Sequence, residues 1–281
     1  MPTSSHPTAS PRFTAMESKF GRTFTEQLTC GYHIHVSVGS EEEGVAVLDR
    51  VRPWLPVLLA LSTNSPFWKG TDSGFASYRY QAWIRWPTAG SYAIFGSAAG
   101  YHEALRQLLH TGVPLDAGMI YFDARLCARY PTVELRMSDV CLDAAHAVAL
   151  AGIVRALVDT AALEWREGQP PEPIPTQVLE LAMWSASKFG IEGDLLDPHL
   201  GCPCPAGETV DALLKHSELA LHRNGDYERV HAAIADIRSG GSGASQQRQV
   251  YARSHSLQSV VEHAVEMTHQ RILPHPARLI A

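Results

Sequence analysis

The sequence has little of what typically marks secreted, membrane-spanning or nucleic-acid-binding proteins. Its 281 residues include five cysteines in an odd, scattered set, which argues against a disulfide framework. The longest apolar candidate for a membrane span, WLPVLLAL at 54–61, falls far short of the roughly 20 residues required. A formal net charge of -6 provides no basic field for nucleic acid.

The N-terminus and the composition point in the same direction. The opening segment MPTSSHPTASPRF lacks the apolar core of a signal peptide, and the chain is 45% hydrophobic and 19% charged. We therefore expect a cytoplasmic protein in which residues 1–12 are disordered and 13–281 form one domain. Its partners should be small molecules rather than nucleic acid or membrane. Cys202 and Cys204 lie in a Gly/Pro-rich loop, but without a second cysteine pair they do not predict a metal site.

Two histidines stand one residue apart in the apolar stretch TCGYHIHVSV. A strand over 30–38 has a period of two, so it places His33, His35 and Ser37 on one face. The other face carries Tyr32, Ile34, Val36 and Val38. The histidine face either binds a metal or substrate, or merely lies on a solvated side of a sheet.

A second strand, predicted over 131–139, alternates in the same way. Val133, Leu135 and Met137 point to one side, whereas the other side carries Thr132, Glu134, Arg136 and Ser138. An acid and a base on one strand can be an ordinary surface pair. Two strands with apolar backs and polar fronts instead predict an α+β fold, in which an antiparallel sheet is backed by helices. Its polar wall would suit an anionic ligand and a divalent cation.

The remaining segments are mostly helical. Ser40 followed by Glu41–Glu43 predicts the capped N-terminus of a helix. Pro53 and Pro56 predict a break within that helix. Residues 64–91 are long and irregular, which is typical of a functional loop. Other elements are expected as follows: helices at 13–28, 141–167, 176–189, 207–222, 226–238 and 245–271, and a strand at 118–125.

Several stretches resemble the bacterial carboxylate-amine ligases, often described as glutamate–cysteine ligase type 2. They are TCGYHIHVSV, RPWLPVLLALSTNSPFWKGTDSGFASYRYQAW, RWPTAG, TVELRMSD and GSGASQQR, and the resemblance runs from about Pro11 to the C-terminus. It implies a glutamine-synthetase-like catalytic domain with ATP and Mg²⁺ on the concave face of the sheet. The implied reaction activates the side-chain carboxylate of glutamate as an acyl phosphate, which the amine of cysteine then attacks.

The resemblance also implies roles for particular residues. Glu134 would bind Mg²⁺, while Arg79 and Arg136 would hold a substrate carboxylate or a nucleotide phosphate. His33 and His35 would face the nucleotide as hydrogen-bond donors or outer ligands, since Mg²⁺ prefers oxygen. The weaker candidates are Arg125 for phosphate, Arg248, which either reaches the site or lies on the surface, Asn64 and Ser77 in the amino-acid pocket, and Trp83, which fits the core equally well.

One feature of that family has no counterpart here, namely an upstream strand with a run of glutamates that look like Mg²⁺ ligands. We interpret the residues after Met1 as an internal connecting segment used as a start. We therefore expect an unpaired sheet edge, which a homodimer could cover, and weak or no activity. Two other functions stay open. One is a binding fragment that has lost its chemistry, and the other is a metal-dependent hydrolase that uses His33 and His35.

Overall fold

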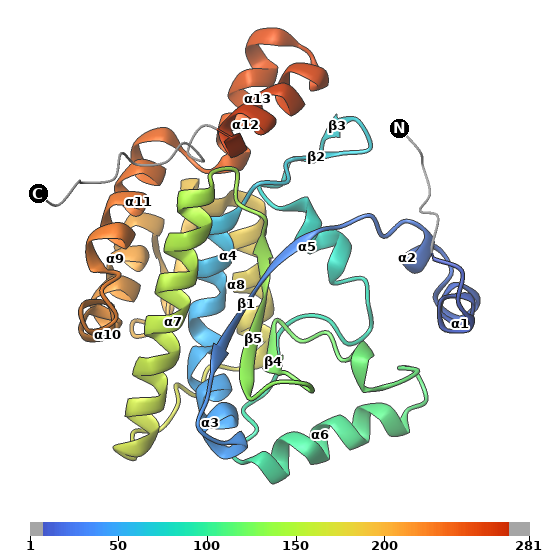
Figure 1. The fold of residues 1–281 in the computed structure, drawn as a ribbon, viewed down its shortest axis with the longest axis vertical. Coiled ribbons are helices and arrows are strands. Elements are labelled where there is room, and N and C mark those ends of the chain that lie inside the picture. The colour runs from blue at the N-terminus through green and yellow to red at the C-terminus, as the bar shows by residue number, and fades with distance from the viewer. Residues whose placement is uncertain (1–7, 270–281) are drawn as a thin grey trace, which may run out of the picture.

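The computed structural model describes residues 8–269 and shows a small antiparallel sheet packed against a layer of helices (Figure 1). The strands follow the order β1 (Gly31–Ser37), β5 (Thr132–Asp139) and β4 (Ala124–Leu126). Both long strands therefore form where their alternation predicted them. This mixture of helices with an antiparallel sheet confirms the α+β prediction.

The central strand β5 determines what each face of the sheet carries. Its back is apolar, with Val133, Leu135 and Met137 no more than 1% exposed. On the front, Glu134 pairs with His35 of β1 and with Arg125 of β4. The predicted division into an apolar and a polar face is confirmed, and β1 and β4 are the outer strands of this sheet within the described residues.

Helices α3 (Glu41–Val51), α4 (Leu55–Ser62) and α7 (Ala144–Arg166) pack against the sheet and build the core with it (Figure 1). Helix α7 is long and apolar enough, by length and composition alone, to cross a membrane, which corrects the expectation from uninterrupted apolar runs. Of its most apolar window, 56% is buried in the protein. A core helix passes the same length and composition test, and α7 occupies that position here.

The acidic triplet after β1 caps a helix, as predicted. The backbone N–H of Glu43 donates to Ser40 Oγ at 3.1 Å, and the Glu43 carboxylate accepts from the backbone N–H of Gly39 at 2.9 Å. Arg166 also donates to Glu43. Pro53 ends α3 in a short 3-10 turn (Arg52–Trp54), after which α4 begins at Leu55.

The remaining elements lie around this centre. The N-terminal half adds α1 (Pro11–Phe20), α2 (Arg22–Thr25), β2 (Phe67–Trp68), β3 (Thr71–Asp72), α5 (Tyr78–Trp83) and α6 (Ala98–His110). The C-terminal half adds α8 (Thr176–Phe189), β6 (Asp194–Asp197), β7 (Cys202–Pro205), α9 (Ala206–His216), α10 (Glu218–Arg223), α11 (Tyr227–Gly240), α12 (Gly243–Ser254) and α13 (Leu257–His269).

Several predicted boundaries are corrected. The helix predicted over 13–28 begins at Pro11 and is interrupted at Gly21, whose φ of 51° a helix interior does not allow. The helix predicted over 245–271 divides into α12 and α13 at His255, which is left-handed, and its last two residues lie outside the described range. Of the strand predicted over 118–125, only Ala124 and Arg125 are extended in the sheet.

Candidate functional site

The carboxylate of Glu134 is the centre of the polar face of the sheet. Its Oε2 accepts from Arg125 Nε at 3.0 Å, and its Oε1 accepts from Arg136 Nη1. His33 Nδ1 lies 3.0 Å and His35 Nε2 lies 3.6 Å from the same Oε1. The structure thus brings four predicted residues, Arg125, Arg136, His33 and His35, around the carboxylate of the fifth, Glu134.

Burial makes this cluster electrostatically strong. Glu134 and Arg136 are only 5% and 7% exposed. Burial alone would raise the pKa of Glu134, but the hydrogen bond from His33 and the charges of Arg136 and Arg125 together hold that pKa well below its usual value. Burial also lowers the pKa of Arg136. Glu134 therefore stays ionised and serves as the counter-charge for two arginines.

Trp83 lies over the guanidinium of Arg136, whose Cζ is 6.0 Å from the ring centroid. Beyond it, Trp83 also contacts the ring of Tyr121. Trp83 also packs against the small apolar cluster that contains Trp86 and Met119, so it lies partly in the core and partly over Arg136. The Nε of Arg136 is buried without a hydrogen-bond partner within residues 8–269, so this guanidinium keeps unused donor capacity.

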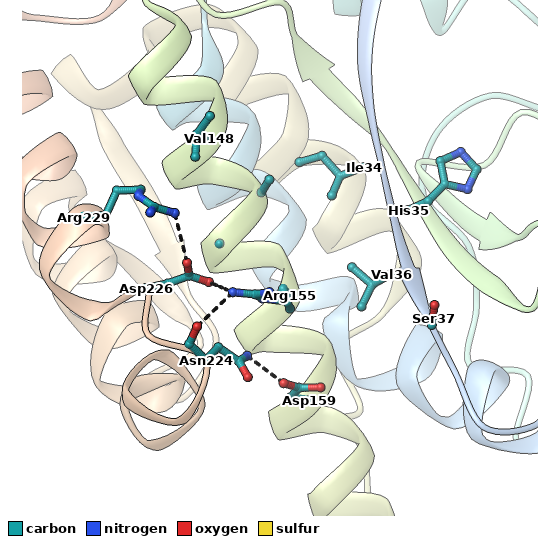
Figure 2. A pocket seen from close by; sticks show the side chains of 12 residues that line it. Ile34, His35, Val36, Ser37, Val148, Arg155, Asp159, Asn224, Asp226 and Arg229 are labelled. Atoms are coloured by element: carbon teal, nitrogen blue, oxygen red, sulfur yellow. Dashed lines mark hydrogen bonds and ion pairs between the residues drawn. The ribbon is translucent and has the colours of Figure 1, made fainter. Parts of the chain in front are cut away.

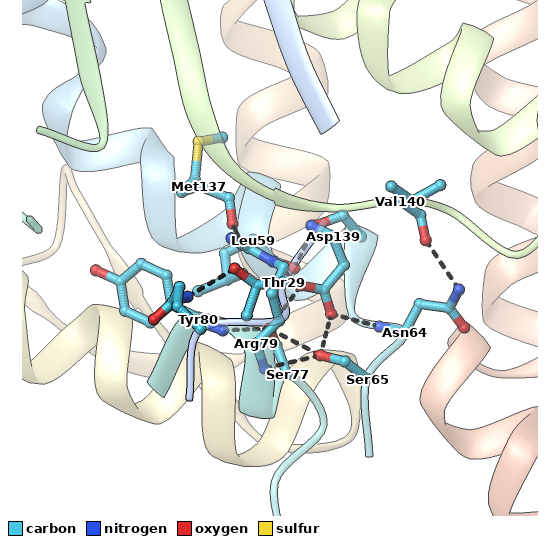
Figure 3. Close-up of polar contacts among 12 residues, drawn as sticks. Thr29, Leu59, Asn64, Ser65, Ser77, Arg79, Tyr80, Met137, Asp139 and Val140 are labelled. Atoms are coloured by element: carbon cyan, nitrogen blue, oxygen red, sulfur yellow. Dashed lines mark hydrogen bonds and ion pairs between the residues drawn. The ribbon is translucent and has the colours of Figure 1, made fainter. Parts of the chain in front are cut away.

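A second polar cluster surrounds Asp139 at the end of β5 (Figure 3). Ser65 and Ser77 each donate a hydroxyl hydrogen bond to its carboxylate at 2.8 Å, and the backbone N–H of Asn64 donates at 2.9 Å. Arg79 completes the set through Nε. Arg79, Asn64 and Ser77, which were predicted as separate site residues, therefore meet at a residue that was not predicted.

Gly31 connects the two clusters. A Cβ built on this glycine would lie 3.4 Å from Arg79 Nη1 and 3.7 Å from His33 Nε2, so both groups flank its backbone. A cavity of about 300 Å³ opens beside Arg79. Its lining includes Cys30, Asn64, Ser65, Trp68, Arg79 and Asp139. The site is therefore a cationic polar wall with an adjoining hollow of small-molecule size.

Asp123 adds a buried acid next to these arginines. It is 1% exposed, accepts from the Tyr80 hydroxyl at 3.0 Å, and its Oδ1 has no partner in the described part of the chain. Burial raises its pKa to about 7, although the hydrogen bond from Tyr80 and the charges of Arg79 and Arg136 oppose this shift. Asp123 can therefore be neutral or charged near neutral pH.

The donor set does not fit a resident Mg²⁺. Among the described residues, Glu134 supplies the carboxylate at the centre of the polar face, and its oxygens already accept from Arg125, Arg136 and His33. Mg²⁺ needs several oxygen ligands in octahedral geometry. The surrounding arginines favour a bound anion instead. The predicted role of Glu134 as a metal ligand stays a prediction.

The histidine pair does not have the spacing of a zinc centre either. In residues 8–269, the one group whose three ligand atoms lie within 4.8 Å of each other is Asp143, His146 and Asp236. Neither His33 nor His35 belongs to it. The hydrolase alternative therefore lacks its expected third ligand.

Arg248 lies apart from both clusters. Its guanidinium forms two hydrogen bonds of 2.8 Å with Asp72 and a third with the carbonyl of Phe75. It fastens α12 to the β3 region. The predicted contact of Arg248 with the site is not seen in this structure.

A larger hollow of about 650 Å³ runs beside the outer edge of β1, between this strand and α7 (Figure 2). Its far wall holds Asp226, which pairs with Arg155 and Arg229. Figure 2 shows the ring of His35 directed away from these residues. The charges of this hollow therefore satisfy one another and do not join the polar face of the sheet.

Two residues of the site escaped the sequence reasoning. Asp139 ends the motif TVELRMSD, one residue beyond the alternating polar positions Thr132, Glu134, Arg136 and Ser138. Asp123 directly precedes β4, two positions before Arg125, and the period of a strand places both on one face. That spacing was the available signal for Asp123.

Comparison with known proteins identifies a family. The model of the glutamate-cysteine ligase family 2 (GCS2) matches residues 2–266. A protein of Paenarthrobacter aurescens named "Putative glutamate--cysteine ligase 2-1" is 54% identical over 94% of this chain and 69% of its own length.

Two further relatives carry the corresponding name. The protein of Streptomyces coelicolor is 51% identical over 92% of this chain and 71% of its own length. The protein of Frankia alni is 46% identical over 95% of this chain and 70% of its own length. With its family model matched almost throughout, the chain belongs to the glutamate-cysteine ligase family 2.

Proposed function

We propose that this protein is an ATP-dependent carboxylate–amine ligase that joins glutamate to cysteine through an acyl phosphate. The family and the names of its relatives support a ligase of glutamate–cysteine type. The observation that carries the proposal is the ring of Arg125, Arg136 and His33 around the buried carboxylate of Glu134. A glutamine-synthetase-like catalytic domain is part of the same proposal.

The charge distribution suits this reaction because both reactants are anions. A nucleotide triphosphate and an amino-acid carboxylate repel each other unless cationic groups neutralise them. Arg79, Arg125 and Arg136 supply planar guanidinium groups that can bind phosphate or carboxylate. Glu134 and Asp139 hold these groups in fixed positions, so little reorganisation is needed when the anions arrive.

The proposed steps balance without a protein nucleophile. A carboxylate oxygen of glutamate attacks the γ-phosphorus of MgATP, which acts as substrate, and ADP leaves. The amine of cysteine then attacks the acyl carbon, phosphate leaves, and the amine proton passes to solvent. Arg125 and Arg136 bind the transferred phosphoryl oxygens, while His33 and His35 donate hydrogen bonds beside them.

Trapping the acyl phosphate tests this proposal directly. The purified protein is incubated with MgATP, glutamate and hydroxylamine, and the hydroxamate and ADP are quantified together. We expect equal amounts of both, and γ-glutamylcysteine when cysteine replaces hydroxylamine. Arg136→Lys should lower the rate by about a hundredfold, because a lysine cannot form the planar contacts.

The same assay, combined with a binding titration of MgATP, separates the alternatives. Nucleotide binding without ADP release would favour the binding fragment that has lost its chemistry. A panel of other carboxylates and amines identifies the substrates, because only the true pair gives stoichiometric ADP. Absence of both binding and turnover with every pair would contradict the proposed function.

A further inference from the structure

Asp139 has no free acceptor capacity, which sets its role. It is 2% exposed, and each carboxylate oxygen already accepts two hydrogen bonds. Oδ1 accepts from Ser77 and Arg79, and Oδ2 accepts from Ser65 and the backbone N–H of Asn64 (Figure 3). A carboxylate offers about four lone-pair positions. No position remains for a substrate, a proton or a metal ion.

Arg79 is held in the opposite way, with one edge left available. Its Nε donates to Asp139 and its Nη2 donates to the carbonyl of Met137. Its Nη1 has no hydrogen-bond partner within residues 8–269 and lies beside Gly31, near His33 Nε2. Two fixed contacts from a planar group determine the direction of the third. Nη1 therefore points to the place where the cavity meets the cluster around Glu134, which contains Arg125, Arg136, His33 and His35.

The surroundings stabilise this geometry from three segments. Asp139 belongs to β5, and Arg79 lies in α5, whose N-cap is Ser77. Asn64 connects Asp139 to the C-terminal part of the chain, because its Oδ1 accepts from Gln247 at 2.6 Å. The Asn64 amide also donates to the carbonyl of Val140 at 2.8 Å. Few rotamers of Arg79 are compatible with all these contacts.

We infer that Asp139 is a positioning residue that aims Nη1 of Arg79 at an anionic oxygen of a substrate. This inference rests on the proposed ligase function. The oxygen belongs either to the carboxylate of the amino acid or to a phosphate of the nucleotide, since both present the same chemistry to a guanidinium. Asp139 itself does not contact the ligand and acts only through Arg79.

Calorimetric titrations test the inference and identify the oxygen. MgATP and L-glutamate are titrated separately into the wild type, Asp139→Asn, Arg79→Lys and the double variant. We expect both single variants to weaken binding of the same ligand by about tenfold, the loss of one charge-assisted hydrogen bond. The other ligand should be unaffected. In the double variant, Asp139→Asn should add nothing to the loss caused by Arg79→Lys.

Asp211→Asn is the matched control, because it also breaks an aspartate–arginine pair, but on the surface with Arg238. It should change neither affinity. The inference is overturned if Asp139→Asn leaves both affinities intact while Arg79→Lys weakens one. It is also overturned if the loss of affinity in the double variant equals the product of the two single losses. Binding without turnover would contradict the ligase function alone and leave this inference standing.

A second measurement covers the case in which Asp139→Asn does not fold. The Nε–H signal of Arg79 in the wild type, assigned by its loss in Arg79→Lys, should exchange slowly with solvent. It should also shift on addition of the ligand whose affinity Arg79→Lys weakens. A rapidly exchanging signal that no ligand shifts would show that Asp139 does not hold this guanidinium.

Discussion

His33 and Glu134 meet across two strands, with His33 Nδ1 3.0 Å from Glu134 Oε1. They are not direct partners in the sheet, because Glu134 pairs with His35. The register shifts between Tyr32 and Ile34, so one residue of β1 faces two residues of β5. Such an irregularity redirects a side chain. The bulge thereby allows both histidines to approach the same carboxylate oxygen.

Replacing Glu134 with Gln should destabilise the fold as well as the site. The carboxylate neutralises Arg125 and Arg136, and the buried Arg136 would lose its counter-charge. We expect the free energy of unfolding to fall by about 3 kcal/mol, as measured by urea denaturation at pH 7. Glu103→Gln breaks an exposed pair with Arg106 and should leave the urea midpoint unchanged.

The stability lost in Glu134→Gln should also depend on pH. The pKa of Glu134 is lowered in the folded protein, so its ionised form stabilises the fold above about 4.5, the value for the free side chain. Below that pH the unfolded chain takes up a proton first, and this contribution disappears. The wild type and Glu134→Gln should therefore converge in stability under acid conditions. A constant difference down to pH 2 would contradict this account.

The convergence of His33, Glu134 and Arg136 on one site was predicted only with the help of the family resemblance, whereas the two strands and their apolar backs followed from periodicity. Periodicity could not predict Asp139, because its role depends on donors from Asn64 and Ser65, far away in sequence. Nor could it show that Glu134 is surrounded by cations. The Glu134–Arg125 contact requires the register of β4 against β5, which only the folded chain defines.

Asp123→Asn should stabilise the protein at alkaline pH. Burial raises the pKa of Asp123 to about 7, so the folded state keeps a proton that the unfolded chain releases near 3.8. Between pH 3.8 and about 7, the free energy of unfolding should therefore fall by about 1.4 kcal/mol for each unit of rising pH. Asparagine imitates the neutral acid and removes this dependence.

Urea titrations of the wild type and Asp123→Asn between pH 4 and 9 measure the effect. The two stabilities should separate progressively as the pH rises to 7 and stay parallel above it. Asp211→Asn, an exposed position, serves as the control and should follow the wild type. Equal pH profiles for the wild type and Asp123→Asn would rule out a neutral Asp123 in the fold.

His216 should contribute to acid sensitivity. Its ring stacks on Trp54 with centroids 5.1 Å apart, and Glu164 lies 3.6 Å from its Nε2. Burial, with a smaller contribution from His199, lowers the pKa of His216 to about 4. Between 6.5 and 4 the unfolded chain binds a proton that the folded chain does not. Stability should therefore fall as the pH decreases through this range.

Replacing His216 with Phe keeps an aromatic ring against Trp54 but removes the titrating group. The stability of this variant between pH 6.5 and 4, followed by urea denaturation, should decline less steeply than that of the wild type. The difference should approach about 1.4 kcal/mol per pH unit. His110→Phe changes an exposed histidine at the end of α6 and should keep the wild-type slope.

Some helix boundaries were also predictable from the local sequence, whereas others were not. The break at Pro53 was predictable, because proline removes a donor and clashes with the preceding turn. The division between α12 and α13 was not, because His255 adopts a left-handed conformation that nothing in its immediate sequence demands. The β6–β7 hairpin was missed because the Gly/Pro-rich composition around Cys202 and Cys204 predicted a loop.

Gly243 is required by the close approach of Asn64. A Cβ at this first residue of α12 would lie 2.3 Å from Asn64 Oδ1 and 2.7 Å from its Cγ, which no real contact tolerates. Gly243→Ala should therefore displace the Asn64 side chain and break its hydrogen bonds with Gln247 and Val140. We expect a loss of about 2 kcal/mol in the free energy of unfolding.

Truncating the obstructing side chain should reverse most of this clash. In an Asn64→Ala background, adding Gly243→Ala should cost much less than it does in the wild type, so the two changes are non-additive. Gly207→Ala, in helix α9, is the control, because nothing lies within 4 Å of its added Cβ. It should leave stability unchanged or raise it slightly, since alanine favours a helix. Equal losses from Gly243→Ala in both backgrounds would show that Asn64 does not fix α12 against the site.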